Sequence, residues 1–350
     1  MLFAIILALF LMLVFLGFFE EYLERYRLYF CAFIAVSLFL YAGMREVGFD
    51  HDSDNYELYF ISSDNPLLAF FAEPSFVLIC EVSKRIWNDV HVVFLIYASL
   101  GVFLKFVAIR RLTPFIFLPL LVYVADMYVL HDLTQIRGGV ASALFLLAIK
   151  PLSEGRKKRA ALYMLAAALF HYSALILFPL LLFGNSDLTL KWKIALSLVF
   201  PLCVVMYMVG FDLLLSLPIP YIQSKVELYR EQTDVGIVER NALIRPFLFI
   251  RLVSYYYCLL FSNTIKEYVP SINLLIKIMG VSIITYYAFT YIPVIGYRLS
   301  ELYGVVEILL IPAMIYTMRP MYIGKLAVVL VAGVMFLYTY VIWDLLDFTL

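Results

Sequence analysis

Residues 45–56 hold the densest group of ionisable side chains in an otherwise apolar part of the chain. The stretch reads REVGFDHDSDNY and supplies these polar groups: Arg45, Asp50, His51, Asp52, Asp54 and Tyr56. Ionisable groups beside membrane-spanning segments are costly and usually functional. We take this cluster as the first candidate for the active site, and its neighbouring carboxylates Asp50 and Asp52 could hold a divalent cation. For each single acid, a solvated loop is the alternative interpretation.

Three arginines are candidates for binding an anion, because Arg137, Arg245 and Arg298 each lie at the start of an apolar segment. Guanidinium groups match phosphate oxygens in pairs, so these side chains suit a phosphorylated substrate. A snorkelling interfacial side chain is the alternative for Arg137. For Arg298 the alternative is a local ion pair with Glu301.

Other polar residues lie inside apolar segments. His171 is near the middle of residues 160–183, where it either contacts substrate or is a hydrogen-bonded core group. Glu307 lies deep in a late segment and needs a buried partner. Gly138-Gly139 would let another backbone approach closely. Weaker candidates for a polar role are Asp126, His131 and Asp132.

Several common chemistries are excluded by missing motifs. The chain has no P-loop, GxGxxG, HExxH or GxSxG pattern, so neither a nucleotide fold nor a hydrolytic triad is indicated. The four cysteines lie far apart without ligand spacing, which predicts inert thiols. A formal net charge of zero gives no sign of nucleic-acid binding. A donor that is already activated, such as a lipid diphosphate sugar, fits this pattern.

The elements that position these residues are membrane-spanning helices. The chain is 65% hydrophobic and 15% charged, against roughly 25% charged in soluble domains. We therefore predict an all-α polytopic integral membrane protein with about 10–12 transmembrane helices, including re-entrant or half-helices. Predicted spans cover residues 1–19, 28–44, 91–109, 114–130, 136–150, 190–210, 244–262, 272–293, 299–317 and 322–342. Residues 66–86 predict an interfacial or re-entrant helix.

The positions of Lys and Arg predict the orientation. The strongest cytoplasmic signal is Arg156–Arg159. The other basic loops can lie on the same side of the membrane only if residues 160–183 enter the membrane and return as two half-helices that break near His171. Both termini, the acidic loop 45–70 and the long loop 211–243 then lie outside. We expect one transmembrane domain over residues 1–350, with an interfacial helix to about residue 86 and residues 211–243 partly ordered as a lid.

Four short patterns together resemble the EpsG/Wzy-type polysaccharide polymerases. They are Arg45-x-x-Gly48-x-Asp50 before Asn55-Tyr56, Gln135-Ile-Arg137, Ala168-Leu-Phe-His171-Tyr-Ser173-Ala, and Tyr297-Arg298. They occur in family order over roughly residues 40–310. The resemblance implies a glycosyltransferase class C-like fold. It also implies joining of undecaprenyl-diphosphate-linked repeat units at the periplasmic face of the bacterial inner membrane, for O-antigen, capsule or exopolysaccharide.

The resemblance also implies roles for the candidate residues. An aspartate among Asp50, Asp52 and Asp54 would be the base, and the remaining candidates would bind diphosphate or sugar: Arg45, Tyr56, Arg137, His171, Arg245 and Arg298. No cofactor is expected beyond the divalent metal alternative. Expected partners are the lipid-linked donor and acceptor, the bilayer, a chain-length regulator and a flippase. An O-antigen ligase-like glycosyltransferase and a lipid-linked oligosaccharide flippase remain alternatives. The glycan product distinguishes a polymerase from a ligase, and the need for a base distinguishes either enzyme from a flippase.

Overall fold

The computed structural model describes residues 2–64, 72–214, 223, 226–227, 230–232, 242–289, 291–343 and 345–348. The first half contains α1 (Leu2–Phe19), η1 (Glu24–Tyr26), α2 (Arg27–Gly43), α3 (Ser53–Ile61), η2 (Ser62–Asp64), α5 (Pro74–Trp87), α6 (Val90–Leu112), α7 (Phe117–Val122), η3 (Tyr123–Thr134), α8 (Ile136–Ser153), α9 (Lys157–Phe170) and η4 (Tyr172–Leu182). The second half contains α10 (Leu190–Ser197), α11 (Val199–Met208), α13 (Pro246–Leu260), α14 (Ser262–Lys266), α15 (Ile272–Ala288), α16 (Pro293–Gly304), α17 (Glu307–Ala313), η6 (Met314–Thr317), α18 (Met321–Leu337) and η7 (Tyr338–Ile342).

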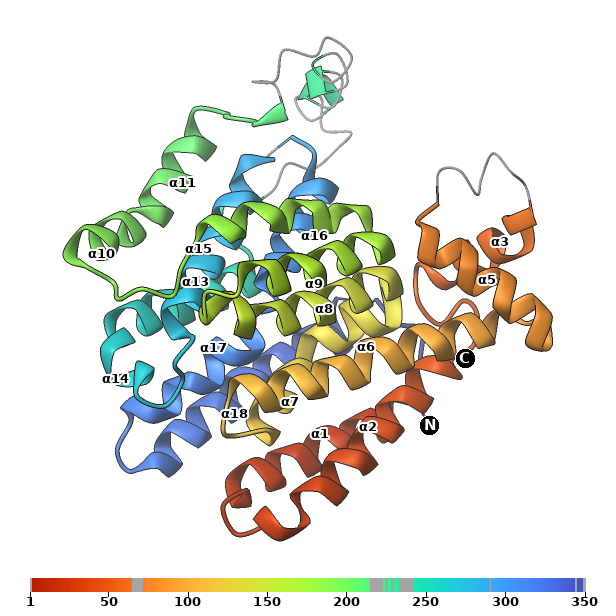
Figure 1. Ribbon diagram of the computed structural model, residues 1–350, viewed down its shortest axis with the longest axis horizontal. Coiled ribbons are helices and arrows are strands. Elements are labelled where there is room, and N and C mark those ends of the chain that lie inside the picture. The colour runs from red at the N-terminus through yellow and green to blue at the C-terminus, as the bar shows by residue number, and fades with distance from the viewer. Residues whose placement is uncertain are drawn as a thin grey trace.

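The protein is an all-α, multi-pass membrane protein, as its composition predicted (Figure 1). In the described residues, 7 helices are long and apolar enough to cross a membrane, or 8 if the pair α16 and α17–η6, bent by 52°, forms one span. Shorter apolar helices are η4, α13 and α15. Helices dominate because lipid offers no partner for backbone N–H and C=O groups, so each segment must satisfy its own.

The centre of the bundle is formed by η3 and α8. The whole of η3 is buried, and its Asp132 accepts hydrogen bonds from Lys105 Nζ at 2.7 Å and from the Tyr123 hydroxyl at 2.7 Å. A Cβ atom on Gly139 would lie 2.3 Å from the carbonyl oxygen of His131. The predicted close approach at Gly138-Gly139 is therefore confirmed at Gly139, where the backbone of η3 leaves no room for a side chain.

The expected break in residues 160–183 is also confirmed. The helix α9 ends at Phe170, His171 is extended with φ −152° and ψ 114°, and η4 begins at Tyr172. The two halves pack against each other as a hairpin. Its tip therefore presents His171 at one end of the bundle, and its two ends return to the other.

Basic residues gather at the end of the bundle away from His171. Lys325 Nζ binds the carbonyl oxygen of Phe18 at 3.0 Å, which joins the start of α18 to the end of α1. The carboxylate of Glu20 accepts from the N–H groups of Ile116 and Phe117 at 2.7 and 3.0 Å, which joins this end of α1 to the start of α7. The same end holds Arg27 and Arg110, which line one cavity, and Arg111, Arg156 and Arg159, which line another.

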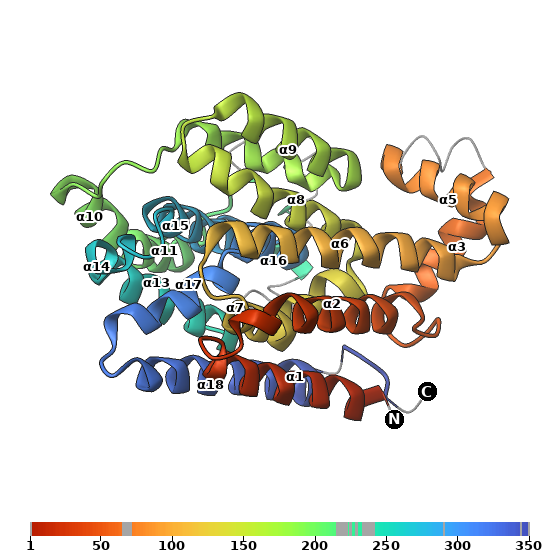
Figure 2. The same cartoon turned by 60° about the horizontal axis from the view of Figure 1, so that its bottom comes forward.

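The opposite end holds α3, α5 and both termini (Figure 2). The N–H of Asp347 donates to the carbonyl oxygen of Phe49 at 2.8 Å, and the rings of Phe3 and Phe348 are 5.3 Å apart. The helix α5 lies where the sequence predicted an interfacial or re-entrant helix. The predicted lid over residues 211–243 falls mostly outside the described residues. Residues 65–70 of the predicted acidic loop also lie outside them.

Candidate active site

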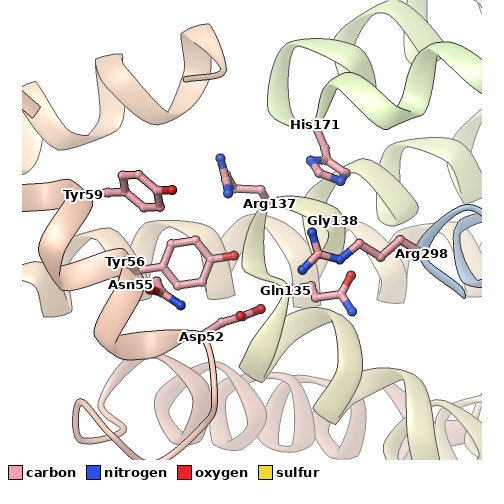
Figure 3. Close-up of a pocket in the computed structure, with 9 residues that line it drawn as sticks. All are labelled: Asp52, Asn55, Tyr56, Tyr59, Gln135, Arg137, Gly138, His171 and Arg298. Atoms are coloured by element: carbon pink, nitrogen blue, oxygen red, sulfur yellow. The ribbon is translucent and has the colours of Figure 1, made fainter. Parts of the chain in front are cut away.

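A polar cavity of about 240 Å³ lies where α3, α8, α16 and the tip of the α9–η4 hairpin meet (Figure 3). Its lining residues among those described are Asp52, Asn55, Tyr56, Tyr59, Gln135, Arg137, Gly138, His171 and Arg298. Four sequence patterns separated by as much as about 250 positions contribute to it. Asp52, Tyr56, Arg137, His171 and Arg298, all proposed from sequence, are brought together here.

Asp52 is the carboxylate that faces the arginines. It precedes α3 as the N-cap residue, but its side chain caps no backbone N–H and instead points into the cavity. Burial raises the pKa of Asp52 above 3.8, with Asp50 adding to the rise, while the nearby charges of Arg298 and Arg137 oppose it. A carboxylate whose pKa is raised toward neutrality is a better general base than an ordinary one.

Arg137 enters the cavity from the first turn of α8. Its guanidinium lies 5.5 Å from the ring of Tyr56 and 5.3 Å from that of Phe76, and one terminal nitrogen is paired with Glu73. The buried Nε atom has no hydrogen-bond partner in the described structure. Because a buried donor without a partner is costly, this arginine is suited to donate a hydrogen bond to an anionic oxygen.

His171 is held by the same glutamate. Its Nδ1 lies 2.9 Å from Oε1 of Glu73, so the carboxylate joins the imidazole to the guanidinium of Arg137. Burial raises the pKa of Glu73, but the hydrogen bond with His171 and the charge of Arg137 outweigh it, and the net pKa is below 4.5. The glutamate is therefore ionised at neutral pH, and it fixes which ring nitrogen faces the cavity.

Sequence reasoning missed Glu73, and it also did not single out Tyr59, which lines the cavity. From the sequence alone Glu73 has no assigned role, and it lies within the predicted interfacial or re-entrant helix of residues 66–86. Its backbone is extended with φ −64° and ψ 141°, as expected before proline, and Pro74 occupies the first turn of α5. The usable signal was a glutamate directly before a helix-starting proline, which places a carboxylate at a fixed position beyond a helix end.

Arg298 reaches the cavity from α16. In Figure 3 its side chain extends toward Gln135 and lies near His171. Within the described residues no ion pair involves Arg298, and Glu301 faces the side chain of Gln135. The local ion pair considered from sequence is not formed, which leaves the Arg298 charge available to a ligand.

The sequence model of the EpsG family matches residues 28–348. The chain belongs to the EpsG family. No curated protein and no solved structure matches it. Family membership supports a polysaccharide polymerase-type role in general, carried out by a glycosyltransferase-like membrane protein.

The cavity that contains Asp52 does not include Arg45 and Asp50. Arg45 Nε binds Oδ2 of Asp50 at 2.8 Å, its Nη1 donates to the carbonyl oxygen of Ala42 at 2.6 Å, and its guanidinium covers the ring of Phe94 at 4.0 Å. Both side chains are almost fully buried, with residue exposures of 2% and 3%. This pair fixes the turn that carries Asp52, which is a structural role.

The same turn disfavours the divalent metal alternative. Oδ1 of Asp50 accepts the N–H of Asp52 at 3.0 Å, so both oxygens of Asp50 already have partners. No group of three or more His, Cys, Asp or Glu side chains in the described part of the chain could hold a metal ion. The arrangement of Asp50 and Asp52 is that of a hydrogen-bonded loop, with one carboxylate used for folding and the other exposed to the cavity.

The remaining predicted residues line other cavities. Asp54 and His51 face the C-terminal segment around Leu346, and Arg245 lies over the ring of Tyr297 at 4.6 Å beside a small second cavity. The structure separates Asp54 from Asp52, because the turn after Asp50 and the first turn of α3 point successive side chains in different directions. It separates Arg245 from Asp52 because Arg245 lies at the start of α13, which does not line the cavity of Asp52.

Several buried polar groups deeper in the bundle contact side chains of other elements. The expected partner of Glu307 is Arg251, whose Nε lies 2.7 Å from Oε2 of Glu307. Asp126 accepts from the hydroxyl of Thr339 at 3.2 Å. Asp132, considered from sequence as a weaker outer candidate, is buried against Lys105. These groups join helices, and they do not line the cavity of Asp52.

Proposed function

We propose that this EpsG-family protein is a polysaccharide polymerase that uses undecaprenyl-diphosphate-linked glycans at the periplasmic face of the bacterial inner membrane. It transfers the growing glycan from its lipid diphosphate to the non-reducing end of an incoming lipid-linked repeat unit. The observation that carries the proposal is one polar cavity in which a carboxylate of raised pKa, Asp52, faces Arg137 and Arg298.

The position of the cavity supports the proposed orientation. It opens at the end of the bundle that holds α3 and α5, whereas basic side chains gather at the other end. Since loops rich in Lys and Arg remain in the cytoplasm, the cavity would face outward. A lipid diphosphate at the outer surface of the membrane would reach it with its sugar outside the bilayer.

In the proposed reaction, a hydroxyl oxygen of the acceptor sugar attacks the anomeric carbon of the donor glycan. Asp52 takes the hydroxyl proton as a new C–O bond forms. The bond between the anomeric carbon and the diphosphate oxygen breaks, and its electron pair leaves with the lipid diphosphate. No metal or nucleotide is required for this balance of atoms and charge.

Arg137 and Arg298 would bind the diphosphate and stabilise the charge that grows on its leaving oxygen. They enter from α8 and α16, so they can contact the two phosphates from two sides. Such preorganised cations are most effective in a cavity shielded from water. Arg137 is half-buried and Arg298 exposed, which suits an inner and an outer phosphate contact.

Glu73 would position this machinery without touching the reacting atoms. Its two carboxylate oxygens bind Arg137 and His171 separately. The imidazole Nε2 is then directed to the cavity, where His171 can orient the acceptor hydroxyl or a phosphate oxygen. A carboxylate behind a histidine commonly fixes both its tautomer and its orientation.

The test is polymerisation by the purified protein in liposomes with its authentic lipid-linked repeat unit, with EDTA added to a parallel sample. A gel ladder of glycan multiples, retained in EDTA and lost in Asp52→Asn, is the expected result. Transfer of single units to a lipid core sugar would identify a ligase. Movement of the substrate across the bilayer without new bonds, unaffected by Asp52→Asn, would identify a flippase and overturn the proposed chemistry.

A further inference from the structure

A polar cavity of about 300 Å³, different from those beside Asp52 and Arg245, lies at the basic end of the bundle. It is not part of the proposed active site. Its lining residues are Arg111, Leu147, Lys150, Pro151, Arg156, Arg159 and Tyr163. Four of these seven side chains are cations and none is acidic. The cavity is larger than that of Asp52, so it has space for a ligand group of the size of a phosphate ester.

Three helices bring the cations together. Arg111 lies in the last turn of α6, Lys150 near the end of α8, and Arg159 in the first turn of α9. The active-site residues lie toward the opposite ends of α8 and α9, at Arg137 and His171. Arg137 and Lys150 are 13 residues apart on α8, which is about 20 Å along the helix axis, so the two cavities lie toward opposite ends of the bundle.

The cluster lacks a matching set of counter-charges. Arg156 pairs with Glu154, but no ion pair involves Arg111, Lys150 or Arg159 within the described residues. All four cations are exposed, so water weakens the repulsion between these like charges but does not remove it. The first N–H groups of α9 add partial positive charge at the same place, because they have no intrahelical acceptor. An anion bound there would relieve both costs.

The uncharged part of the cavity indicates which anion. Leu147 and Pro151 form an apolar wall, and the half-buried Tyr163 adds an amphipathic ring. A phosphate attached to a glycerol backbone would place its charge among the arginines and its apolar part along this wall. Basic pockets between helices at the cytoplasmic end of membrane proteins commonly bind lipid head groups.

We propose that the cavity between α6, α8 and α9 is a binding site for the phosphate head group of an anionic membrane lipid. The shared chemistry is a phosphate ester held by arginines and a lysine, and a soluble phosphate compound would use the same contacts. The site is independent of the proposed polymerase activity, because no residue of the Asp52 cavity lines it.

Lys158 supplies a matched control. It is exposed, it neighbours Arg159 in the first turn of α9, and it does not line the cavity. If the basic end attracted anionic lipid only in a general way, Lys158→Gln and Arg159→Gln would weaken lipid binding equally. If the cavity is a specific site, Arg159→Gln and Lys150→Gln would weaken lipid binding much more than Lys158→Gln does.

The experiment is native mass spectrometry of the full-length protein released from detergent, titrated with phosphatidylglycerol, phosphatidylcholine or inorganic diphosphate. We expect tighter binding of phosphatidylglycerol than of phosphatidylcholine, weakened about fivefold by Arg159→Gln or Lys150→Gln and unchanged by Lys158→Gln. Melting temperatures measured in phosphatidylcholine alone verify that each variant is folded.

The diphosphate arm identifies the source of the phosphate. Saturable diphosphate binding that falls in Arg159→Gln but not in Lys158→Gln supports the site and shows that a soluble ester also enters it. Binding of phosphatidylglycerol alone supports the site and restricts it to lipid. Equal losses in Arg159→Gln and Lys158→Gln, or no preference for the anionic lipid, would overturn the proposal.

Discussion

Asp50 and Asp52 are two positions apart in the sequence, yet their surroundings are opposite. Asp50 is buried and neutralised by Arg45, whereas Asp52 caps nothing and faces a cavity. Removing one partner of a buried ion pair leaves an uncompensated charge, while removing a carboxylate of raised pKa relieves a desolvation cost. The two residues should therefore respond differently to the same substitution.

We expect Asp52→Asn to lower the chain-joining rate by about 10²–10⁴-fold, with a thermal stability equal to or slightly above that of the natural protein. Asp50→Asn should instead lower the free energy of unfolding by about 3–5 kcal/mol. Polymerisation assays and thermal unfolding in detergent measure both effects. A stable, fully active Asp52→Asn variant would remove this residue from the mechanism.

In the proposed mechanism, the raised pKa of Asp52 predicts that the rate of chain joining falls at acidic pH. Protonation removes the base, so the rate should fall as the pH falls through the pKa of Asp52, which lies above 3.8. Because the charge of Arg298 lowers that pKa, the remaining activity of Arg298→Gln should begin to fall at a higher pH than that of the natural protein. Arg298→Lys, which keeps the charge, is the control. A pH profile identical in Arg298→Gln and Arg298→Lys would contradict the coupling.

At the scale of elements, the tip of the α9–η4 hairpin and the N-terminus of α5 are joined through one carboxylate. Glu73 binds His171 and Arg137, and the hydroxyl of Tyr172 donates to the carbonyl oxygen of Ala72 at 3.2 Å. These contacts hold an apolar hairpin, a central helix and a peripheral helix in one arrangement. The geometry of the cavity therefore depends on Glu73 as much as on the residues that line it.

We expect Glu73→Gln to lower the free energy of unfolding at neutral pH by about 1–3 kcal/mol. Since the pKa of Glu73 is lower in the folded protein than the usual 4.5, its contribution is present above that value and lost as the pH falls through the folded pKa. The natural protein and the variant should thus converge in stability on acidification. Thermal unfolding at a series of pH values measures this, and a constant difference would contradict it.

The packing of η3 on α8 gives a second prediction at this scale. Gly139→Ala would force a methyl group against the His131 carbonyl, where only 2.3 Å is available, and should cost about 1–3 kcal/mol. Gly138→Ala is the matched control, because its nearest contact, the Cβ of Gln135, is at an ordinary 3.7 Å. Helix propensity alone favours alanine at both positions. Equal melting temperatures in the two variants would contradict the close approach.

At the scale of the whole molecule, the distribution of charge predicts which end faces outward. Arg85 on α5 and Lys158 in the first turn of α9 are both exposed. The helix α5 lies at the end that holds α3 and both termini, whereas α9 begins beside the basic cavity at the other end. In a cysteine-free background, Arg85→Cys should react with a membrane-impermeant maleimide in intact cells, whereas Lys158→Cys should react only after permeabilisation. The reverse pattern would turn the proposed site toward the cytoplasm.

The sequence alone determined the class of the protein and most of its spans. Continuous apolar runs are sufficient, because each helix satisfies its own backbone and its stability in lipid depends mainly on local composition. It also indicated the break at His171 from the balance of basic loops, and the need of Glu307 for a buried partner. These inferences depend on composition along one segment or on the cost of an isolated charge.

The tertiary structure alone decided which polar residues share a cavity. It selected Asp52 and turned Asp50 to Arg45, and it brought Glu73 to His171 from 98 positions away. Neither choice can be made from spacing, because the direction of a side chain in an irregular turn depends on the segments packed around it. The cluster of cations between α6, α8 and α9 was likewise decided by helix packing, since its members belong to three separate elements.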